Sequence, residues 1–253
     1  MDTTRHAGRI AVVTGAGSGI GRATVLRLAQ EGASVIGCDV DSAGLDATRA
    51  ALAHVGATAE FDVADITDQA AVDRLVAAAG PRIDVLANVA GIMDHFLPLG
   101  EMDDATWERV LAVNLTGTMR LSRAVLPVME AGGGGAIVTV ASEASLGAGA
   151  SGTAYATSKH ALIGLVRSIA FYYAPRGVRS NAVLPGAVAT GIGTTAAPRV
   201  PWAMERARLA MATMPPEPAE PDAIAAVISW LACDEAANVN GALVTADGGW
   251  AAA

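Results

Sequence analysis

Short apolar runs alternate along the chain with longer segments in which apolar residues recur at helical spacing. Seven runs rich in β-branched residues predict strands, at residues 9–15, 33–40, 58–63, 83–90, 135–142, 178–186 and 242–249. These runs are apolar at successive positions, which is typical of strands in a parallel sheet that is covered on both faces. The alternation predicts an α/β fold: a single-domain, Rossmann-like, doubly wound parallel sheet of about seven strands with helices on both faces.

Three segments show the clearest helical spacing, at residues 20–32, 103–130 and 152–175. We find no linker and no internal repeat, so we expect residues 1–253 to form one domain. Only residues 187–221, which are rich in Pro and Met, interrupt the alternation of strands and helices. We expect one short helix there, near 201–212. A long insertion at the carboxyl end of a strand is where such sheets carry a substrate lid, although an ordinary connecting loop is the alternative.

Composition narrows the class of protein. The chain is 52% hydrophobic and 17% charged, so it can bury a large core. Its formal net charge of −8 leaves no basic surplus for a phosphate backbone, which argues against a nucleic-acid partner. Cys38 and Cys233 lack the spacing of a metal site or redox pair, and the histidines His6, His54, His95 and His160 form no metal-ligand pattern, so we expect no metal site.

Targeting signals are not apparent in the sequence. The charged residues at the start of the chain are not followed by an apolar run, and no uninterrupted apolar stretch reaches the length that spans a bilayer. We therefore expect a cytoplasmic protein with no membrane partner.

The segment "TGAGSGIG" at 14–21 joins the first predicted strand to the first predicted helix. Glycine lets the backbone turn tightly and approach a pyrophosphate there, and the start of the helix offers free N–H groups. The spacing departs from G-x-G-x-x-G, because Gly15, Gly19 and Gly21 are joined by an additional Gly17. Glycines also serve ordinary turns, but the position between strand and helix favours a dinucleotide site.

Asp39 ends the second predicted strand. A carboxylate at this place can accept hydrogen bonds from the ribose hydroxyls of an adenosine and repels a 2′-phosphate. Residues 15–19 and 38–42 contain no Arg or Lys, and we expect the helical turn to direct Arg22 away. The pattern favours NAD over NADP, although a solvated strand end is the alternative for Asp39.

Tyr155 and Lys159 lie one helical turn apart, on the same face of a predicted helix. A nearby ammonium favours the phenolate, so we expect Lys159 to lower the pKa of Tyr155 and allow it to exchange a proton with a substrate oxygen. A packing tyrosine and a surface amine are the alternatives. Ser142 follows the fifth strand, where it faces the ligand crevice or caps the strand end. Asn114 is a poor helix former within 103–130, which indicates a specific role or a helix irregularity.

Together these motifs resemble the short-chain dehydrogenase/reductase family over essentially the whole chain. The matching residues are "TGAGSGIG" at 14–21, "DV" at 62–63, "NVAG" at 88–91, Asn114 in "VNLTG", Ser142, "YATSK" at 155–159 and "PG" at 185–186. The resemblance implies a catalytic set in which Tyr155 is the general acid/base, Lys159 tunes it and holds a ribose, Ser142 orients the carbonyl and Asn114 supports a water-linked proton relay.

The resemblance also implies which residues bind the cofactor. Asp62 and Val63 match the pair at the adenine ring, and the segment from Pro185 to Thr190 matches the one that contacts the nicotinamide carboxamide. The expected cofactor-binding residues are Gly15, Ser18, Gly19, Ile20, Gly21, Asp39, Asp62, Val63, Asn88, Ala90, Gly91, Tyr155, Lys159, Pro185, Gly186, Val188 and Thr190.

Two departures from the family pattern leave the substrate open. Glu143 follows the catalytic serine where a small polar residue is frequent, and residues 214–225 lack the usual Gly-Arg before the Pro-acidic turn. Our candidate pocket residues indicate a hydrophobic or cyclic substrate, but the apolar ones also suit a core, and His95 also suits a solvated loop. They are Met93, His95, Leu97, Glu143, Leu146, Ala187, Trp202 and Met204.

The expected function is an NAD-dependent oxidoreductase that interconverts a secondary alcohol and a ketone. A 3-oxoacyl-thioester (acyl carrier protein) reductase is the first alternative, and it would more often require NADP and a basic docking patch. A non-catalytic nucleotide-sensing protein is the second, and it would be expected to have lost one of the four catalytic residues. The resemblance also implies a homotetramer, for which residues 103–130 and 152–175 offer packing faces that include Phe171, Tyr172 and Tyr173.

Overall fold

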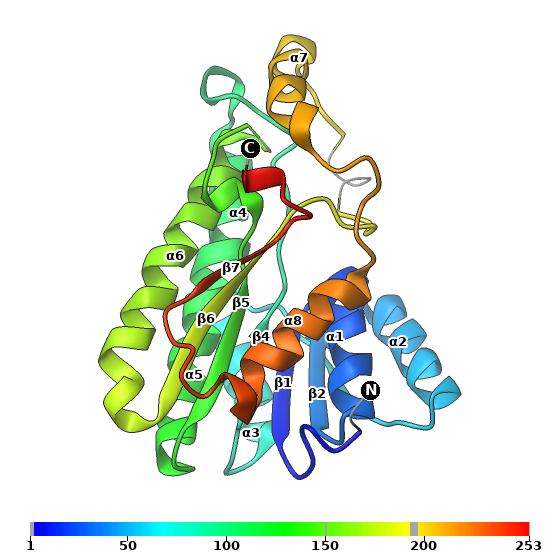
Figure 1. The fold of residues 1–253 in the computed structure, drawn as a ribbon, viewed down its shortest axis with the longest axis vertical. Helices are drawn as coiled ribbons and strands as arrows, with labels where there is room; N and C mark the ends of the chain where they lie inside the picture. The colour runs from blue at the N-terminus through cyan, green and yellow to red at the C-terminus, as the bar shows by residue number, and fades with distance from the viewer. Residues whose placement is uncertain (1–2, 150, 193–196, 253) are drawn as a thin grey trace.

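The computed structural model describes residues 3–149, 151–192 and 197–252. Its centre is a parallel seven-stranded sheet in the order β3-β2-β1-β4-β5-β6-β7 (Figure 1). The strands are β1 (Ile10–Thr14), β2 (Ser34–Asp39), β3 (Glu60–Val63), β4 (Val85–Asn88), β5 (Gly135–Val140), β6 (Val178–Pro185) and β7 (Leu243–Ala246). The doubly wound α/β fold and all seven predicted strands are confirmed, although the strands are shorter at their ends than the apolar runs.

Eight α-helices are described. They are α1 (Gly19–Gln30), α2 (Ser42–His54), α3 (Gln69–Ala79), α4 (Asp104–Leu111), α5 (Thr118–Ala131), α6 (Thr153–Tyr173), α7 (Pro201–Ala210) and α8 (Pro221–Ala232). The predicted helices at 20–32, 152–175 and 201–212 are confirmed. The long helical pattern predicted over 103–130 is confirmed as an uninterrupted run of helix, in which a π-helical segment, Ala112–Gly117, lies between α4 and α5. Within the predicted lid 187–221, residues 193–196 lie outside the described residues.

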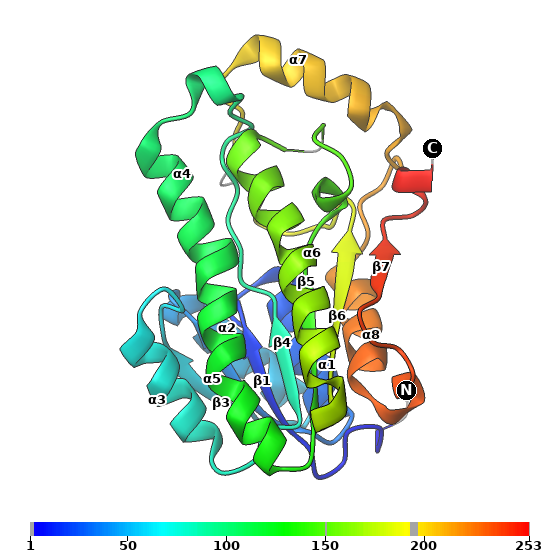
Figure 2. The ribbon, with the colours of Figure 1, turned by 90° about the vertical axis from the view of Figure 1, so that its left-hand side faces the viewer.

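The helices form two layers, one on each face of the sheet (Figures 1 and 2). Helices α1, α2 and α8 pack on one face through side chains such as Leu28 and Ile228, and α3, α5 and α6 pack on the other through Leu75 and Leu121. The inner strands are buried on both faces as predicted. The edge strands β3 and β7 are partly exposed, because each has a neighbouring strand on one side alone.

The strand order reverses between β1 and β4, and parallel sheets of this kind bind ligands at the carboxyl ends of the strands beside that reversal. Thr14 joins the end of β1 to the segment after β4 at this reversal. Its Oγ1 accepts hydrogen bonds from the backbone N–H groups of Val89 at 2.9 Å and Ala90 at 3.0 Å. Helix α7 crosses above the same edge of the sheet, over the first turns of α6 (Figure 2). The fold therefore places the predicted site residues around one end of the molecule.

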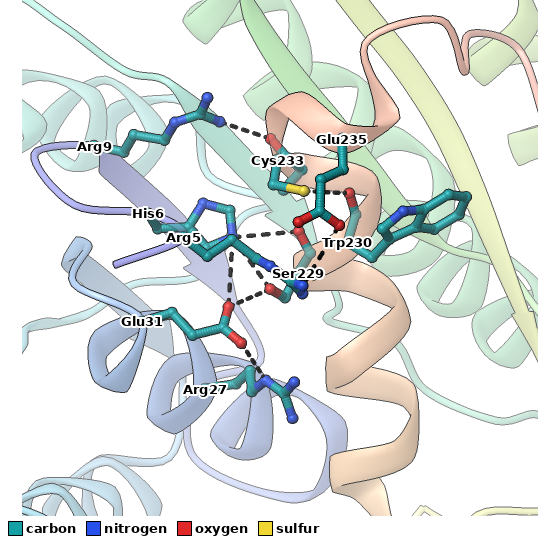
Figure 3. Close-up of polar contacts among 10 residues, drawn as sticks. Arg5, His6, Arg9, Arg27, Glu31, Ser229, Trp230, Cys233 and Glu235 are labelled. Atoms are coloured by element: carbon teal, nitrogen blue, oxygen red, sulfur yellow. Dashed lines mark hydrogen bonds and ion pairs between the residues drawn. The ribbon is translucent and has the colours of Figure 1, made fainter. Parts of the chain in front are cut away.

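A second group of buried polar side chains lies at the opposite, amino end of the sheet (Figure 3). Ser229 Oγ donates a hydrogen bond to the Glu31 carboxylate, and Arg27 Nε donates another at 2.6 Å. His6 Nε2 lies 3.2 Å from Ser229 Oγ and 3.6 Å from a Glu31 oxygen. We call His6, Arg27, Glu31 and Ser229 the amino-end cluster. It ties the N-terminal segment to α1 and α8.

Burial sets the protonation state of His6 in this cluster. His6 and Ser229 are 0% exposed and Glu31 is 1% exposed. Loss of hydration lowers the pKa of His6 below its ordinary value of 6.5, and this effect outweighs the attraction of Glu31. The imidazole is therefore neutral at neutral pH.

Among the described residues, no helix combines the length and the apolar character needed to cross a lipid bilayer.

Candidate active site

The loop between β1 and α1 comes close to the end of β4. Gly15 has a left-handed φ of 69°, and a Cβ at this position would lie 3.1 Å from the Ala90 backbone. A Cβ on Gly21 would lie 1.9 Å from the Gly15 carbonyl oxygen, so a larger residue cannot fit without moving the loop. The glycines that the sequence singled out therefore allow close approach of backbone segments at the reversal of the strand order, which a pyrophosphate site requires.

Asp39 lies at the carboxyl end of β2 and faces this loop. One of its oxygens accepts a hydrogen bond from Gly17 N at 2.9 Å, and the other accepts from Asp41 N at 3.0 Å. Each oxygen keeps a further lone pair for a hydroxyl donor. Arg22 donates to the Gly17 carbonyl and, at 3.0 Å, to Thr48 Oγ1, so its guanidinium lies behind the loop rather than in the cleft.

One cleft runs across the carboxyl ends of the strands, and it brings together fifteen of the predicted catalytic and cofactor-binding residues. They are Gly15, Ser18, Gly19, Ile20, Gly21, Asp39, Ala90, Gly91, Ser142, Tyr155, Lys159, Pro185, Gly186, Val188 and Thr190. These residues come from the last positions of β2 and β6, from the loops after β1, β4, β5 and β6, and from α1 and α6. The cleft therefore spans the dinucleotide-binding end and the proposed catalytic end of the site.

Four predicted residues do not line this cleft. Val63 is 54% exposed, and it and Asp62 lie at the end of edge strand β3. Asn88 is buried and donates to Ser122 Oγ at 3.1 Å. Asn114 lies behind the cleft wall.

Tyr155 and Lys159 share the buried face of α6, and they are 8% and 3% exposed. Lys159 Nζ donates to the Val140 carbonyl oxygen at 2.8 Å and lies 5.5 Å from the centroid of the Tyr155 ring. Small neighbours such as Ala156 and Ser158 let this helix pack closely, which buries both polar groups beside the cleft.

Burial controls the titration of both groups. It raises the pKa of Tyr155 to about 12, against a hydrogen bond with Ser142 and together with the negative charge of Asp94. It lowers the pKa of Lys159 to about 8. The pKa of Tyr155 in this structure is therefore raised rather than lowered as expected, because loss of hydration at the buried phenol is the largest influence on it.

Ser142 performs two tasks at the end of β5. Its hydroxyl accepts a hydrogen bond from Ala144 N at 3.1 Å, which starts the short 3-10 helix Glu143–Ser145, and it lies close enough to the Tyr155 phenol to affect its pKa. The two expected positions of Ser142, at the strand end and beside Tyr155, are thus compatible.

Asn114 connects the wall of the cleft to α6. Its Oδ1 accepts from Ile92 N at 2.8 Å, and its Nδ2 donates to Ile92 O at 3.0 Å and to Ser158 Oγ at 3.0 Å. It lies in the π-helical segment, so the helix irregularity that the sequence indicated is present. A role in a proton relay stays a prediction.

The eight candidate substrate residues do not gather in one pocket, and none lines the main cleft. Leu97 and Trp202 line a second cleft between α7 and the first turns of α6, and Leu146 lines a third near the C-terminus. Met93 packs in the apolar cluster around Tyr155. The backbone of His95 contacts the segment before α7, and Met204 is part of that helix. Ala187 bonds Ala219 across the base of the segment.

Glu143 is the remaining candidate, and it is half-buried next to Ser142. Burial and the negative charge of Asp247 raise its pKa. These positions place the Glu143 carboxyl beside Ser142 without identifying a substrate contact.

Comparison with known proteins identifies the family of the chain. The family model described as short chain dehydrogenase matches residues 9–200. The chain belongs to the short-chain dehydrogenase family. This short-chain dehydrogenase is thus an oxidoreductase with a nucleotide-binding Rossmann fold.

Two curated relatives match over nearly their full length. The chain is 40% identical to "3beta-hydroxysteroid dehydrogenase 2" of Eggerthella lenta over 100% of both proteins. It is also 40% identical to "Cis-4-hydroxycyclohexanecarboxylate dehydrogenase" of Sinomonas cyclohexanicum, over 96% of this chain and 97% of that protein.

Solved structures share the fold closely. Levodione reductase has a TM-score of 0.90 at 35% identity, with 98% of this chain and 100% of that chain covered. A Beutenbergia cavernae dehydrogenase that contains NADP at low occupancy has a TM-score of 0.88 at 39% identity, with both chains covered fully. A Mycobacterium paratuberculosis short-chain dehydrogenase bound to NAD has a TM-score of 0.87 at 30% identity, with 98% of this chain and 100% of that chain covered. Both dinucleotides therefore occur among the structural neighbours.

Several residues of this short-chain dehydrogenase that shape the site were missed by the sequence analysis. The cleft is also lined by Cys38, Val40, Ala64, Asp65, Ile66, Thr67, Val89, Ile92, Arg109, Ala112, Val113, Val140, Ala141 and Ile192. Six of them, Cys38, Val40, Ala64, Val89, Ile92 and Ala141, adjoin predicted residues at strand ends, and that adjacency was the available signal. Within the described residues, no group of three or more His, Cys, Asp or Glu side chains is arranged to hold a metal ion.

Proposed function

We propose that this short-chain dehydrogenase uses NAD to interconvert a secondary alcohol and a ketone on a hydrophobic or cyclic substrate. The observation that carries the proposal is the convergence of Tyr155, Lys159 and Ser142 on a cleft that begins at the glycine loop and Asp39. Such an arrangement joins a proton-transfer group to a dinucleotide site.

The residues present fit NAD. The close approach of Gly15 to Ala90 leaves backbone rather than side chains beside the pyrophosphate position. Asp39 would accept the hydroxyls of the adenosine ribose, and its charge disfavours a 2′-phosphate because the nearby guanidinium of Arg22 bonds Gly17 and Thr48 instead. When bound, the nicotinamide supplies the hydride donor or acceptor.

The protein's own side chains transfer the proton. With its pKa raised to about 12, Tyr155 is a phenol at neutral pH and can donate its proton to a carbonyl oxygen during ketone reduction. In alcohol oxidation the phenolate form of Tyr155 accepts the proton and becomes the phenol. Lys159, whose pKa is lowered to about 8, is mostly an ammonium at neutral pH and favours the phenolate that forms after donation. Ser142, which lies near the same phenol, orients the substrate oxygen.

Apolar surroundings support the proposed class of substrate. Tyr155 packs in a cluster with Val110, Ala144 and Ala154, beside Ile92, Met93, Met102 and Trp107. The names of both curated relatives place a hydroxyl group on a steroid or a cyclohexane. We therefore propose a ring-bearing secondary alcohol, with 187–221 as the lid over it.

An initial-rate screen tests the proposed function. Purified protein would be assayed with NAD and NADP on hydroxysteroids, substituted cyclohexanols and a 3-oxoacyl thioester, with Tyr155→Phe as the blank. We expect turnover of a cyclic alcohol with NAD that the blank lacks. Binding of NAD without turnover of any alcohol or ketone would reject the proposal in favour of a nucleotide-sensing role.

We also propose a homotetramer, as expected from the family. At the end of α6, Phe171 and Tyr172 are 75% and 69% exposed and contact each other edge to face. Large exposed aromatic surface of this kind suits a subunit contact. Light scattering at micromolar concentration should give four subunits, and a monomer would reject this assembly.

A further inference from the structure

Asp94 is a buried carboxylate in the connection between β4 and α4, and the proposed mechanism does not use it. It is 0% exposed. One oxygen accepts a hydrogen bond from Gly152 N at 3.1 Å, and the other accepts from Tyr155 N at 2.8 Å. Within the described residues, Asp94 forms no ion pair. Its carboxylate is therefore directed at the first turn of the helix that carries Tyr155.

This contact replaces a local helix cap. The first N–H groups of a helix have no partner inside the helix, and a side chain at the N-cap position usually accepts from them. The N-cap of α6 is Gly152, which has no side chain to do so. Asp94 supplies the acceptor from a distant part of the chain, and the neighbouring Leu97 carbonyl accepts from Thr153 N at 2.9 Å.

The fit between the two segments leaves no room for a side chain at Gly152. A Cβ there would lie 2.5 and 2.6 Å from the two Asp94 oxygens and 2.4 Å from Leu97 N. The φ of Gly152 is −82°, which other residues adopt freely. Glycine is thus needed at this position for the approach of Asp94 and not for the backbone conformation.

The segment that holds Asp94 is itself strained and anchored. His95 and Phe96 both have left-handed φ angles, of 58° and 57°, which is uncommon for residues other than glycine. Arg199 N donates to the His95 carbonyl at 3.3 Å, and His95 Nδ1 lies 3.3 Å from the Ala197 carbonyl. Strained backbone persists where surrounding contacts determine it. Figure 2 shows this connection rising past the start of α6 toward α7.

We infer that Asp94 is a positioning residue for the proposed reaction: its carboxylate holds the first turn of α6, and thereby Tyr155, in place against the β4–α4 connection. The inference rests on the proposed function. Asp94 would thus support the four residues of the catalytic set through a contact from a distant part of the chain.

The charge of Asp94 also acts on the phenol. The polar groups that face Tyr155 are Lys159 from its own helix, Ser142 from the end of β5 and Asp94 from the β4–α4 connection, whereas α4 contributes apolar contacts. Asp94 opposes ionisation of Tyr155. Removing the negative charge while keeping the shape should therefore move the titration of Tyr155 to lower pH.

The test is the Asp94→Asn variant, which keeps one acceptor oxygen. In alcohol oxidation with NAD we expect kcat to fall by about 10-fold to 100-fold, a typical cost of misplacing a reacting group, with little change in KM. We expect the rise of kcat/KM with pH to shift to lower pH. The ultraviolet absorbance titration of Tyr155, isolated by subtracting the Tyr155→Phe protein, should shift in the same direction without any substrate. Asp68→Asn is the matched control, because the exposed Asp68 caps helix α3 by accepting from Ala70 N at 3.0 Å.

An unchanged kcat with an unshifted phenol titration in folded Asp94→Asn would overturn the inference, and a lower kcat with no shift would reduce Asp94 to a structural role.

If Asp94→Asn does not fold, Gly152→Ala displaces the carboxylate while keeping its charge, and kcat should again fall by about 10-fold or more. Its control is Gly164→Ala in the same helix, where a Cβ meets nothing within 4 Å. Equal kcat in the two glycine variants would also overturn it. If the wild type turns over no substrate, the proposed function fails. The absorbance titration needs no substrate, so it then tests separately whether Asp94 acts on the Tyr155 phenol.

Discussion

Two clusters of buried polar groups lie at opposite ends of the same sheet, and they differ in how their charges are satisfied. At the amino end, the Glu31 carboxylate is bound by Arg27, Ser229 and the neighbouring His6 (Figure 3). At the carboxyl end, the Lys159 ammonium bonds the Val140 carbonyl, and no carboxylate of the described residues pairs with it.

The two clusters also differ in whether their residues line the cleft. Tyr155 and Lys159 line it, whereas no residue of the amino-end cluster does. Burial shifts pKa values at both ends, down for His6 and up for Tyr155. In this protein a shifted pKa therefore points to a catalytic role only where the group also lines the open cleft, as Tyr155 does. Where the group is enclosed by its partners, as His6 is, the shifted pKa points to a role in stability.

The largest expected effect is the loss of activity in Tyr155→Phe. Removing the phenol oxygen removes the proton donor, so kcat/KM should fall by about 10²-fold to 10⁴-fold. The free energy of unfolding should change by about 1 kcal/mol, since one hydrogen bond is lost. Initial rates and urea denaturation measure the two quantities, and Tyr172→Phe at an exposed position is the control.

Glu31→Ala should produce the opposite result. It leaves Arg27 without its buried partner and removes the acceptor of Ser229, which typically costs about 3–5 kcal/mol of unfolding free energy. The kcat of the folded fraction should stay unchanged, because the cluster is at the far end of the sheet. Asp46→Ala, which breaks the exposed pair with Arg49, should cost about 0–1 kcal/mol in the same denaturation experiment.

Asp39→Ala tests the dinucleotide end of the cleft. Loss of hydrogen bonds from a charged acceptor should raise the KM for NAD by about 10-fold to 100-fold. The kcat/KM for NADP should not fall, because the repelling charge is gone. Asp41→Ala, at an exposed position two residues later, is the control. An equal loss with both cofactors would contradict the proposed discrimination.

The smallest expected effect is the pH dependence of stability from His6. Its folded pKa is below 6.5, so as the pH falls through this value the unfolded chain takes up a proton that the folded chain does not. Stability from His6 is thus present above pH 6.5 and is lost in acid. Denaturation midpoints between about pH 5 and pH 8 should depend less on pH in His6→Gln than in the wild type. The exposed His54→Gln variant should behave like the wild type.

Much of the fold was predictable, because inner parallel strands such as β1 are buried on both faces and leave continuous apolar runs in the sequence. The spacing of Tyr155 and Lys159 was equally local, since helical geometry alone puts them on one face. Asp94 left no local signal, because its acceptor role depends on a glycine 58 positions away. The amino-end cluster was missed for the same reason, since Ser229 meets Glu31 across 198 positions.

The Tyr155 pKa shows a different limit of sequence reasoning. The spacing to Lys159 predicts attraction, but it carries no information on how deeply both groups are buried. In the folded protein, loss of hydration decides the direction of both shifts.

The most direct test of the division between the two clusters is kcat for Tyr155→Phe and Glu31→Ala, measured side by side on the same alcohol with NAD at a temperature where both are folded. The account predicts that Tyr155→Phe loses about 10²-fold or more while Glu31→Ala keeps the wild-type value per folded molecule. Wild-type turnover by Tyr155→Phe, or an equal loss in both variants, would contradict it.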